Sequence, residues 1–72
     1  MSKWRFYFRN DSLHLEGSQE VEYPDKTKAA EIFSDALAWQ DNITNTGHLS
    51  VTNLSTGETY IHIGRGKWSK SK

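Results

Sequence analysis

The stretch from Pro24 to Asp41 most constrains the fold of this chain, because its apolar residues recur at helical spacing. They fall at positions i, i+3, i+4, i+7 and i+8, which places five of them on one stripe of a helix: Ala29, Ile32, Phe33, Ala36 and Leu37. Asp25 or Thr27 is expected to cap the first turn, since both side chains accept hydrogen bonds from free N–H groups. We predict one helix over about 26–41, and the remaining residues must cover its apolar stripe.

Two strands are predicted before the helix. Residues 4–9, WRFYFR, alternate between aromatic and mostly basic side chains, which is typical of a half-buried strand. A turn at residues 10–12 leads to a second strand that includes Leu15. Residues 21–23 either prolong that second strand past a bulge or form a short strand of their own.

A second hairpin is predicted after the helix, from HLSVTN at 48–53 and TYIHIG at 59–64. The element order β-β-α-β-β predicts an α+β fold, a two-layer sandwich of a four-stranded antiparallel sheet with the helix packed on one face. Two strand orders, 2-1-3-4 and 1-2-4-3, keep every neighbour antiparallel, and both stay open. Residues 1–66 are expected to form one domain, and residues 67–72 a basic, flexible tail.

One helix leaves the opposite face of the sheet uncovered, and alternation predicts which side chains occupy that face. They are Arg5, Tyr7, Arg9, His14, Glu16, His48, Ser50, Thr52, Tyr60 and His62. Exposed aromatic rings between cations are typical of sheets that stack unpaired RNA bases, and Tyr, Trp and Arg also dominate protein interfaces. We predict that a partner binds this face and the charged ends through Arg5, Tyr7, Arg9, His14, His48, Tyr60, His62, Arg65, Lys67 and Trp68.

The charges sum to zero but are unevenly distributed along the chain. Residues 1–10 carry three basic residues and residues 59–72 carry four, whereas residues 11–58 hold all nine acids against two lysines. This pattern fits either a solvated surface with a basic tail or a bipolar surface that docks an oppositely patterned partner. Trp39 and Trp68 lie outside the main stripe and are either the rim of the core or anchors of an interface.

Several function classes are not expected. The chain has no cysteine, and its three histidines lie on separate predicted strands without metal-ligand spacing, so we predict no metal site and no cofactor. The acids lie on loop and helix positions and no serine occupies a nucleophile turn, so we predict no enzyme. No run of eight apolar residues is present, which predicts neither a signal peptide nor a membrane span, and the expected location is the cytoplasm.

The layout resembles a loose group of short, uncharacterised bacterial and phage proteins. The resemblance covers Phe6 to Ile63 and rests on an aromatic strand (FYF), an acidic stretch ending in EYPD, an alanine-bearing helix (KAAEIFSDALAW) and a hairpin (LSVTNLSTGETYIHI). In size and charge patterning the chain is also similar to phage-encoded inhibitors of bacterial defence, including anti-CRISPR proteins. This likeness does not rest on a shared sequence motif, so no site residue is transferred from these inhibitors to this chain.

Two functions are expected from these patterns. The first is a small non-enzymatic binding protein that occludes a surface of a bacterial protein or ribonucleoprotein complex, as a phage inhibitor of a defence complex does. The alternative is a small nucleic-acid-binding domain that uses the aromatic and basic face of the sheet. An edge strand could also pair two copies into a homodimer.

Overall fold

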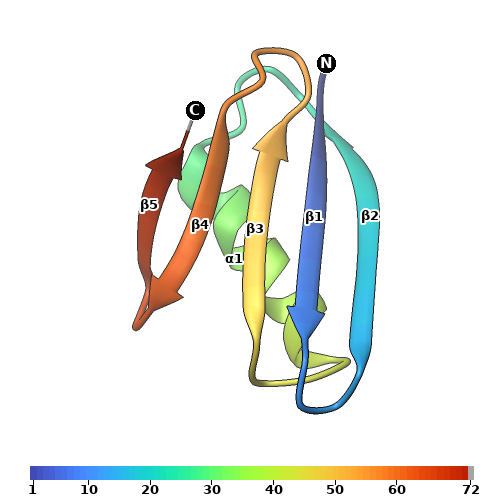
Figure 1. The fold of residues 1–72 in the computed structure, drawn as a ribbon. Helices are drawn as coiled ribbons and strands as arrows, with labels where there is room; N and C mark the ends of the chain where they lie inside the picture. The colour runs from blue at the N-terminus through green and yellow to red at the C-terminus, as the bar shows by residue number, and fades with distance from the viewer. Residues whose placement is uncertain (72) are drawn as a thin grey trace.

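One antiparallel sheet and one helix form the two layers of the molecule over residues 1–71, which this computed structural model describes (Figure 1). The helix is α1 (Ala29–Asp41). The strands are β1 (Ser2–Asn10), β2 (Leu15–Tyr23), β3 (His48–Asn53), β4 (Thr59–Gly64) and β5 (Lys67–Ser71). Their order across the sheet is β2-β1-β3-β4-β5, and every neighbouring pair is antiparallel. The predicted two-layer α+β class is therefore confirmed, with the strand order 2-1-3-4 extended by a fifth strand.

The fifth strand corrects the prediction of a four-stranded sheet and a flexible tail. Lys67–Ser71 pairs with β4, and only Lys72 of the predicted tail lies outside the described residues. The Trp68 ring stacks on Phe33 of α1, with their centroids 4.4 Å apart. The one apolar residue of this basic stretch thereby attaches β5 to the helix, a contact that alternation along the sequence does not reveal.

The core lies between α1 and the middle of the sheet. It is formed by Trp4, Phe6 and Phe8 of β1, Leu49 and Val51 of β3, and Ile32 and Ala36 of α1. Trp39 closes one side of this core, because its ring lies 5.8 Å from that of Phe6 and 5.2 Å from that of Phe8. Of the two interpretations of Trp39, the structure supports the core rim.

The helix begins at Ala29, later than predicted, and neither predicted capping residue caps it. Lys28 occupies the N-cap position and provides no side-chain cap. Asp25 is engaged elsewhere, since its carboxylate lies 3.3 Å from the N-terminal amine and accepts a hydrogen bond from Ser2 Oγ at 3.1 Å. Ala29 is exposed, so the buried stripe begins at Ile32, one turn later than predicted.

The connection from α1 to β3 is held against the end of β1. The buried Asn10 side chain donates through Nδ2 to both the hydroxyl and the carbonyl oxygen of Thr46, at 2.7 and 3.2 Å, and lies 3.3 Å from Thr44 Oγ1. Gly47 has φ of 109°, and a Cβ at this position would lie 2.6 Å from the Arg9 carbonyl oxygen. Only glycine permits this close approach without strain.

We predict that Gly47→Ala lowers the free energy of unfolding by at least about 2 kcal/mol, because the methyl group meets backbone at a strained dihedral. Gly57→Ala is the matched control: Gly57 also has positive φ, but its Cβ would meet no atom within 4 Å. This control should cost only about 1 kcal/mol. Urea denaturation measures both, and equal losses would contradict the packing of Gly47 on β1.

A second prediction concerns the attachment of β5. Trp68→Ala should lower the free energy of unfolding by about 2 kcal/mol and increase amide exchange along β4 and β5, because the stacking on Phe33 is lost. Ser69→Ala, an exposed position on the same strand, should change stability by less than about 0.5 kcal/mol. A Trp68→Ala variant as stable as wild type would restore the flexible-tail prediction.

Candidate functional site

The face of the sheet turned away from α1, here called the open face, is covered by no other element of residues 1–71 (Figure 1). Side chains alternate along each strand, so the residues of β1 that alternate with the buried Trp4, Phe6 and Phe8 point to this face. The residues opposite them in the strand register share the same face. Its charged half, on β1 and β2, consists of Lys3, Arg5, Tyr7, Arg9, Glu16, Ser18, Glu20 and Glu22. Its neutral half, on β3, β4 and β5, includes Ser50, Thr52, Thr59, Ile61, Ile63 and Ser69, with His48 at the start of β3.

Cations and acids face each other across the charged half. Arg5 Nη2 lies 2.8 Å from Glu20 Oε2, and Lys3 Nζ lies 3.9 Å from the other oxygen of the same carboxylate. Arg9 Nε lies 3.3 Å from Asp11 Oδ1. The three basic side chains of β1 are therefore paired with carboxylates of the turn and strand that follow it.

These contacts shift the proton affinities of two groups in the charged half. The hydrogen bond from Arg5 lowers the pKa of the Glu20 carboxyl group below its usual value, and the positive charges of Arg5 and Lys3 add to this effect. Tyr7 donates its hydroxyl proton to Glu16 Oε2, and this hydrogen bond raises the pKa of Tyr7. Both shifts reinforce the states that unperturbed Glu and Tyr side chains already have at pH 7.

The neutral half combines hydroxyl groups with exposed isoleucine. Thr52 and Thr59 share a hydrogen bond of 3.1 Å between their hydroxyls across β3 and β4. Ile61 lies beside Ser50 in the register and is half-buried, while Ile63 at the end of β4 is 62% exposed. This half offers apolar and hydrogen-bonding contacts without a dense array of charges.

The prediction that Tyr60 and His62 lie on the open face is wrong. Tyr60 lies opposite the buried Val51, and its ring lies 5.2 Å from that of Phe33 on α1. His62 lies opposite Trp68, with ring centroids 4.9 Å apart on the helix side. The reason is that the segment TYIHI has large side chains at both its odd and its even positions, so alternation alone does not say which set faces the helix. The ring contacts with α1 and β5 place Tyr60 and His62 on the helix side.

The other predicted residues are divided among several locations. Arg5, Tyr7, Arg9 and His48 lie on the open face, as does Glu16. His14 lies in the β1–β2 turn with φ of 55°, Arg65 in the β4–β5 turn with φ of 53°, and Lys67 begins β5. Trp68 packs on the helix side and so belongs to the rim of the core rather than to the open face.

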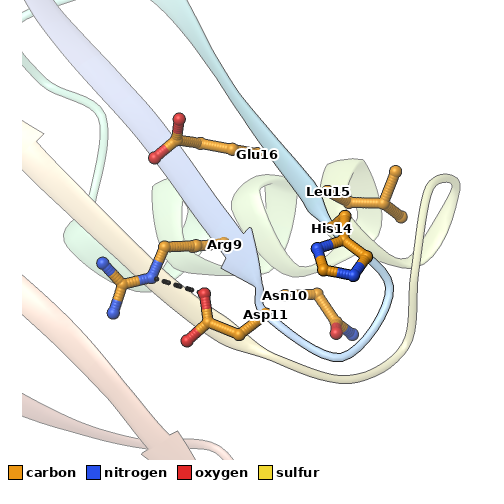
Figure 2. Close-up of a pocket in the computed structure, with 6 residues that line it drawn as sticks. All are labelled: Arg9, Asn10, Asp11, His14, Leu15 and Glu16. Atoms are coloured by element: carbon orange, nitrogen blue, oxygen red, sulfur yellow. Dashed lines mark ion pairs between the residues drawn. The ribbon is translucent and has the colours of Figure 1, made fainter.

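A shallow hollow of about 470 Å³ lies at the β1–β2 turn. It is lined by Arg9, Asn10, Asp11, His14, Leu15 and Glu16, and Figure 2 shows the Arg9–Asp11 ion pair at this site. The Arg9 guanidinium group is thus engaged by a neighbouring carboxylate, and the Asn10 amide belongs to the loop contacts described above. The hollow therefore combines polar and apolar surface beside the open face.

The three histidines do not converge on a metal site. Within residues 1–71, no three His, Asp or Glu side chains lie close enough together to hold a metal ion. The same residues include no helix long and apolar enough to cross a membrane.

The fold and the open face define a small α+β protein with one helix on an antiparallel sheet of five strands. Comparisons of the chain with protein-family models, with curated proteins and with solved structures gave no match. The proposals that follow are therefore argued from the open face and the edges of the sheet.

The charge pairing predicts a pH dependence that can be measured at one carboxylate. Glu20 has a lowered pKa in the folded chain, so its contribution to stability is complete above the pKa of an unfolded glutamate, about 4.3. That contribution is lost as the pH falls through the lower folded value. Arg5→Gln should raise the Glu20 pKa toward the unfolded value in a carboxyl-carbon NMR titration.

The control for this titration is Lys3→Gln, because Lys3 lies farther from the Glu20 carboxylate than Arg5 does. This substitution should raise the Glu20 pKa by less than Arg5→Gln does. Equal effects of the two substitutions would show that the Arg5 hydrogen bond does not cause the shift.

Proposed function

We propose that the protein is a non-enzymatic binding protein that acts by covering a surface of a larger protein complex. The observation that carries this proposal is the open face, a sheet surface with no other element of residues 1–71 over it. A sheet face of this kind presents side chains at regular spacing on a rigid backbone, which suits a broad contact better than a water-excluding catalytic cleft.

The open face suits a protein partner better than a nucleic acid. Base stacking needs exposed aromatic rings, and of the predicted rings Tyr7 lies on the open face, whereas Tyr60 and His62 point to the helix side. Phosphate binding needs available cations, and Arg5 and Arg9 are paired with carboxylates. Both requirements of the nucleic-acid alternative are therefore weakly met.

The neutral half resembles the centre of a protein interface in its lack of charged residues. Such centres are depleted of charged residues and rich in apolar contacts, with hydrogen bonds at intervals. Ile61 and Ile63 supply the apolar contacts, and the hydroxyl groups of Ser50, Thr52 and Thr59 supply the hydrogen bonds. We assign the main contact to this half and the specificity to the charged residues beside it.

The narrower role that we propose is inhibition of a bacterial defence complex by a phage-encoded protein acting in the host cytoplasm. This role rests on the likeness of the chain to phage-encoded inhibitors in size and charge patterning. Covering a surface of such a complex needs no catalytic group and no cofactor.

The proposal is tested by capture of a partner from nuclease-treated bacterial lysate. The tagged protein should retain one stoichiometric protein complex, and Ser50→Arg should abolish capture because it places a bulky charge in the middle of the open face. Ser34→Arg, on the exposed surface of α1, is the matched control and should leave capture unchanged. Circular dichroism verifies that both variants are folded.

Two results would overturn the proposal. The first is capture that survives Ser50→Arg but is lost with Ser34→Arg. The second is a Kd below about 10 µM for single-stranded RNA that weakens steeply between 50 and 200 mM salt, because counterion release would then identify a nucleic-acid-binding protein. The narrower role predicts that expression of the protein restores phage plaques on a strain carrying the captured complex.

A further inference from the structure

The two edges of the sheet, β2 and β5, differ in how far they resist pairing with another strand. Every second residue of an edge strand directs its N–H and C=O away from the sheet, where they can pair with an added strand. β5 is five residues long, carries Lys67 and Lys70, and pairs with β4 through an irregular register between His62 and Gly64. Short length, charged side chains, above all lysine, and irregularity are features by which edge strands avoid such pairing.

β2 carries three glutamates but has none of the other protective features. It is nine residues long, contains neither lysine nor proline, and pairs with β1 in unbroken register from Leu15 to Tyr23. Figure 1 shows β2 as the outermost strand on its side of the sheet, and α1 packs most closely on β3. The outward N–H and C=O groups of β2 therefore form an uninterrupted row.

The side chains of β2 indicate what strand would fit beside it. Its open-face residues include three acids, Glu16, Glu20 and Glu22, and the strand has no basic residue. Glu20 is paired with Arg5 and Lys3, whereas Glu16 and Glu22 form no ion pair within residues 1–71. A neighbouring strand with Lys or Arg at its open-face positions would lie within cross-strand pairing distance of these acids.

The helix side of β2 favours apolar neighbours. Leu15, Val21 and Tyr23 are half-buried and pack against the core, and the Tyr23 hydroxyl donates to Asp35 Oδ2 of α1 at 2.9 Å. An added strand would extend this side of the sheet and cover the parts of Leu15 and Val21 that remain exposed. The fitting strand therefore alternates basic and apolar residues.

We propose that the β2 edge is a strand-addition site that binds an extended segment of a protein partner with alternating basic and apolar side chains. This inference rests on the proposed function, since it specifies how a protein partner is held. Backbone hydrogen bonds to β2 supply affinity, and the acids at positions 16, 20 and 22 select a basic segment.

A second copy of the chain fits this edge less well than such a segment. Two antiparallel β2 edges would bring acids of one copy beside acids of the other, and like charges across strands are destabilising. Pairing β2 with β5 of another copy would match charges but would use the short, irregular edge. The charge of β2 thus favours a different, basic partner.

The test uses a peptide of known alternation, SKWRFYFRN, which is the β1 sequence of this chain. Titrated into ¹⁵N-labelled protein at 50 mM salt, it should shift the amide signals of Leu15–Tyr23 and leave those of β3 and β5 unchanged. A control peptide, SEWEFYFEN, with its three cations replaced by glutamate, should bind at least about tenfold more weakly.

Protein variants separate binding at the β2 edge from binding elsewhere on the molecule. The double variant Glu16→Lys, Glu22→Lys should weaken peptide binding at least about tenfold, and the near-isosteric double variant Glu16→Gln, Glu22→Gln should give a smaller loss. Ser69→Lys with Ser71→Lys, which adds charge to β5, is the matched control and should bind the peptide as wild type does.

Three results would overturn the inference: no shifts at millimolar peptide, shifts centred on β5, or loss of the β1 and β3 signals, which would mean that the peptide replaces β1. Signals of β2 that shift with protein concentration alone would assign the edge to a second copy instead.

In the lysate assay, capture that survives the double lysine variant but is lost with Ser50→Arg would refute the edge site while retaining the proposed function.

Discussion

Ring contacts between β1, α1 and the last two strands are the constraint on which the rest of the structure depends. Phe6 and Phe8 hold Trp39 of α1 on one side of the core, and Trp4 stacks on Tyr60, whose ring meets Phe33. The same layer of rings continues to Trp68 of β5, which stacks on Phe33. Because aromatic rings bury large areas, this layer joins both ends of the chain to one helix in a domain too small to have a second core.

Burial of the rings has a direct consequence for function. A sheet that used Tyr60 and His62 on its open face could stack bases, whereas this sheet directs both rings to the helix side and leaves hydroxyls and isoleucine outside. Pairing of Arg5 with Glu20 and of Arg9 with Asp11 also engages two cations of the open face that a polyanion would need. The same packing that stabilises the chain therefore leaves the open face with fewer aromatic rings for base stacking.

The sequence predicts elements well where one alternation or period dominates. Strict alternation around Phe6 predicts β1 and both of its faces, and the spacing of Ile32 and Ala36 predicts the helix. Prediction is wrong where the local pattern is ambiguous or incomplete. β4 carries large side chains at both alternating sets of positions, so alternation alone assigns Tyr60 to the wrong face. β5 has only one apolar residue, Trp68, so its sequence is typical of a tail.

By itself, the sequence determined the α+β class, the presence of one helix, the faces of β1 and the presence of an uncovered sheet face, because these follow from local periodicity. The tertiary structure alone decided the fifth strand, the phase of β4, the pairing of charges between β1 and β2 and the contrast between the two edges of the sheet. The physical reason is that each of these depends on contacts between residues far apart in the chain. An aromatic ring or a charged group has no preferred partner until the strands have paired.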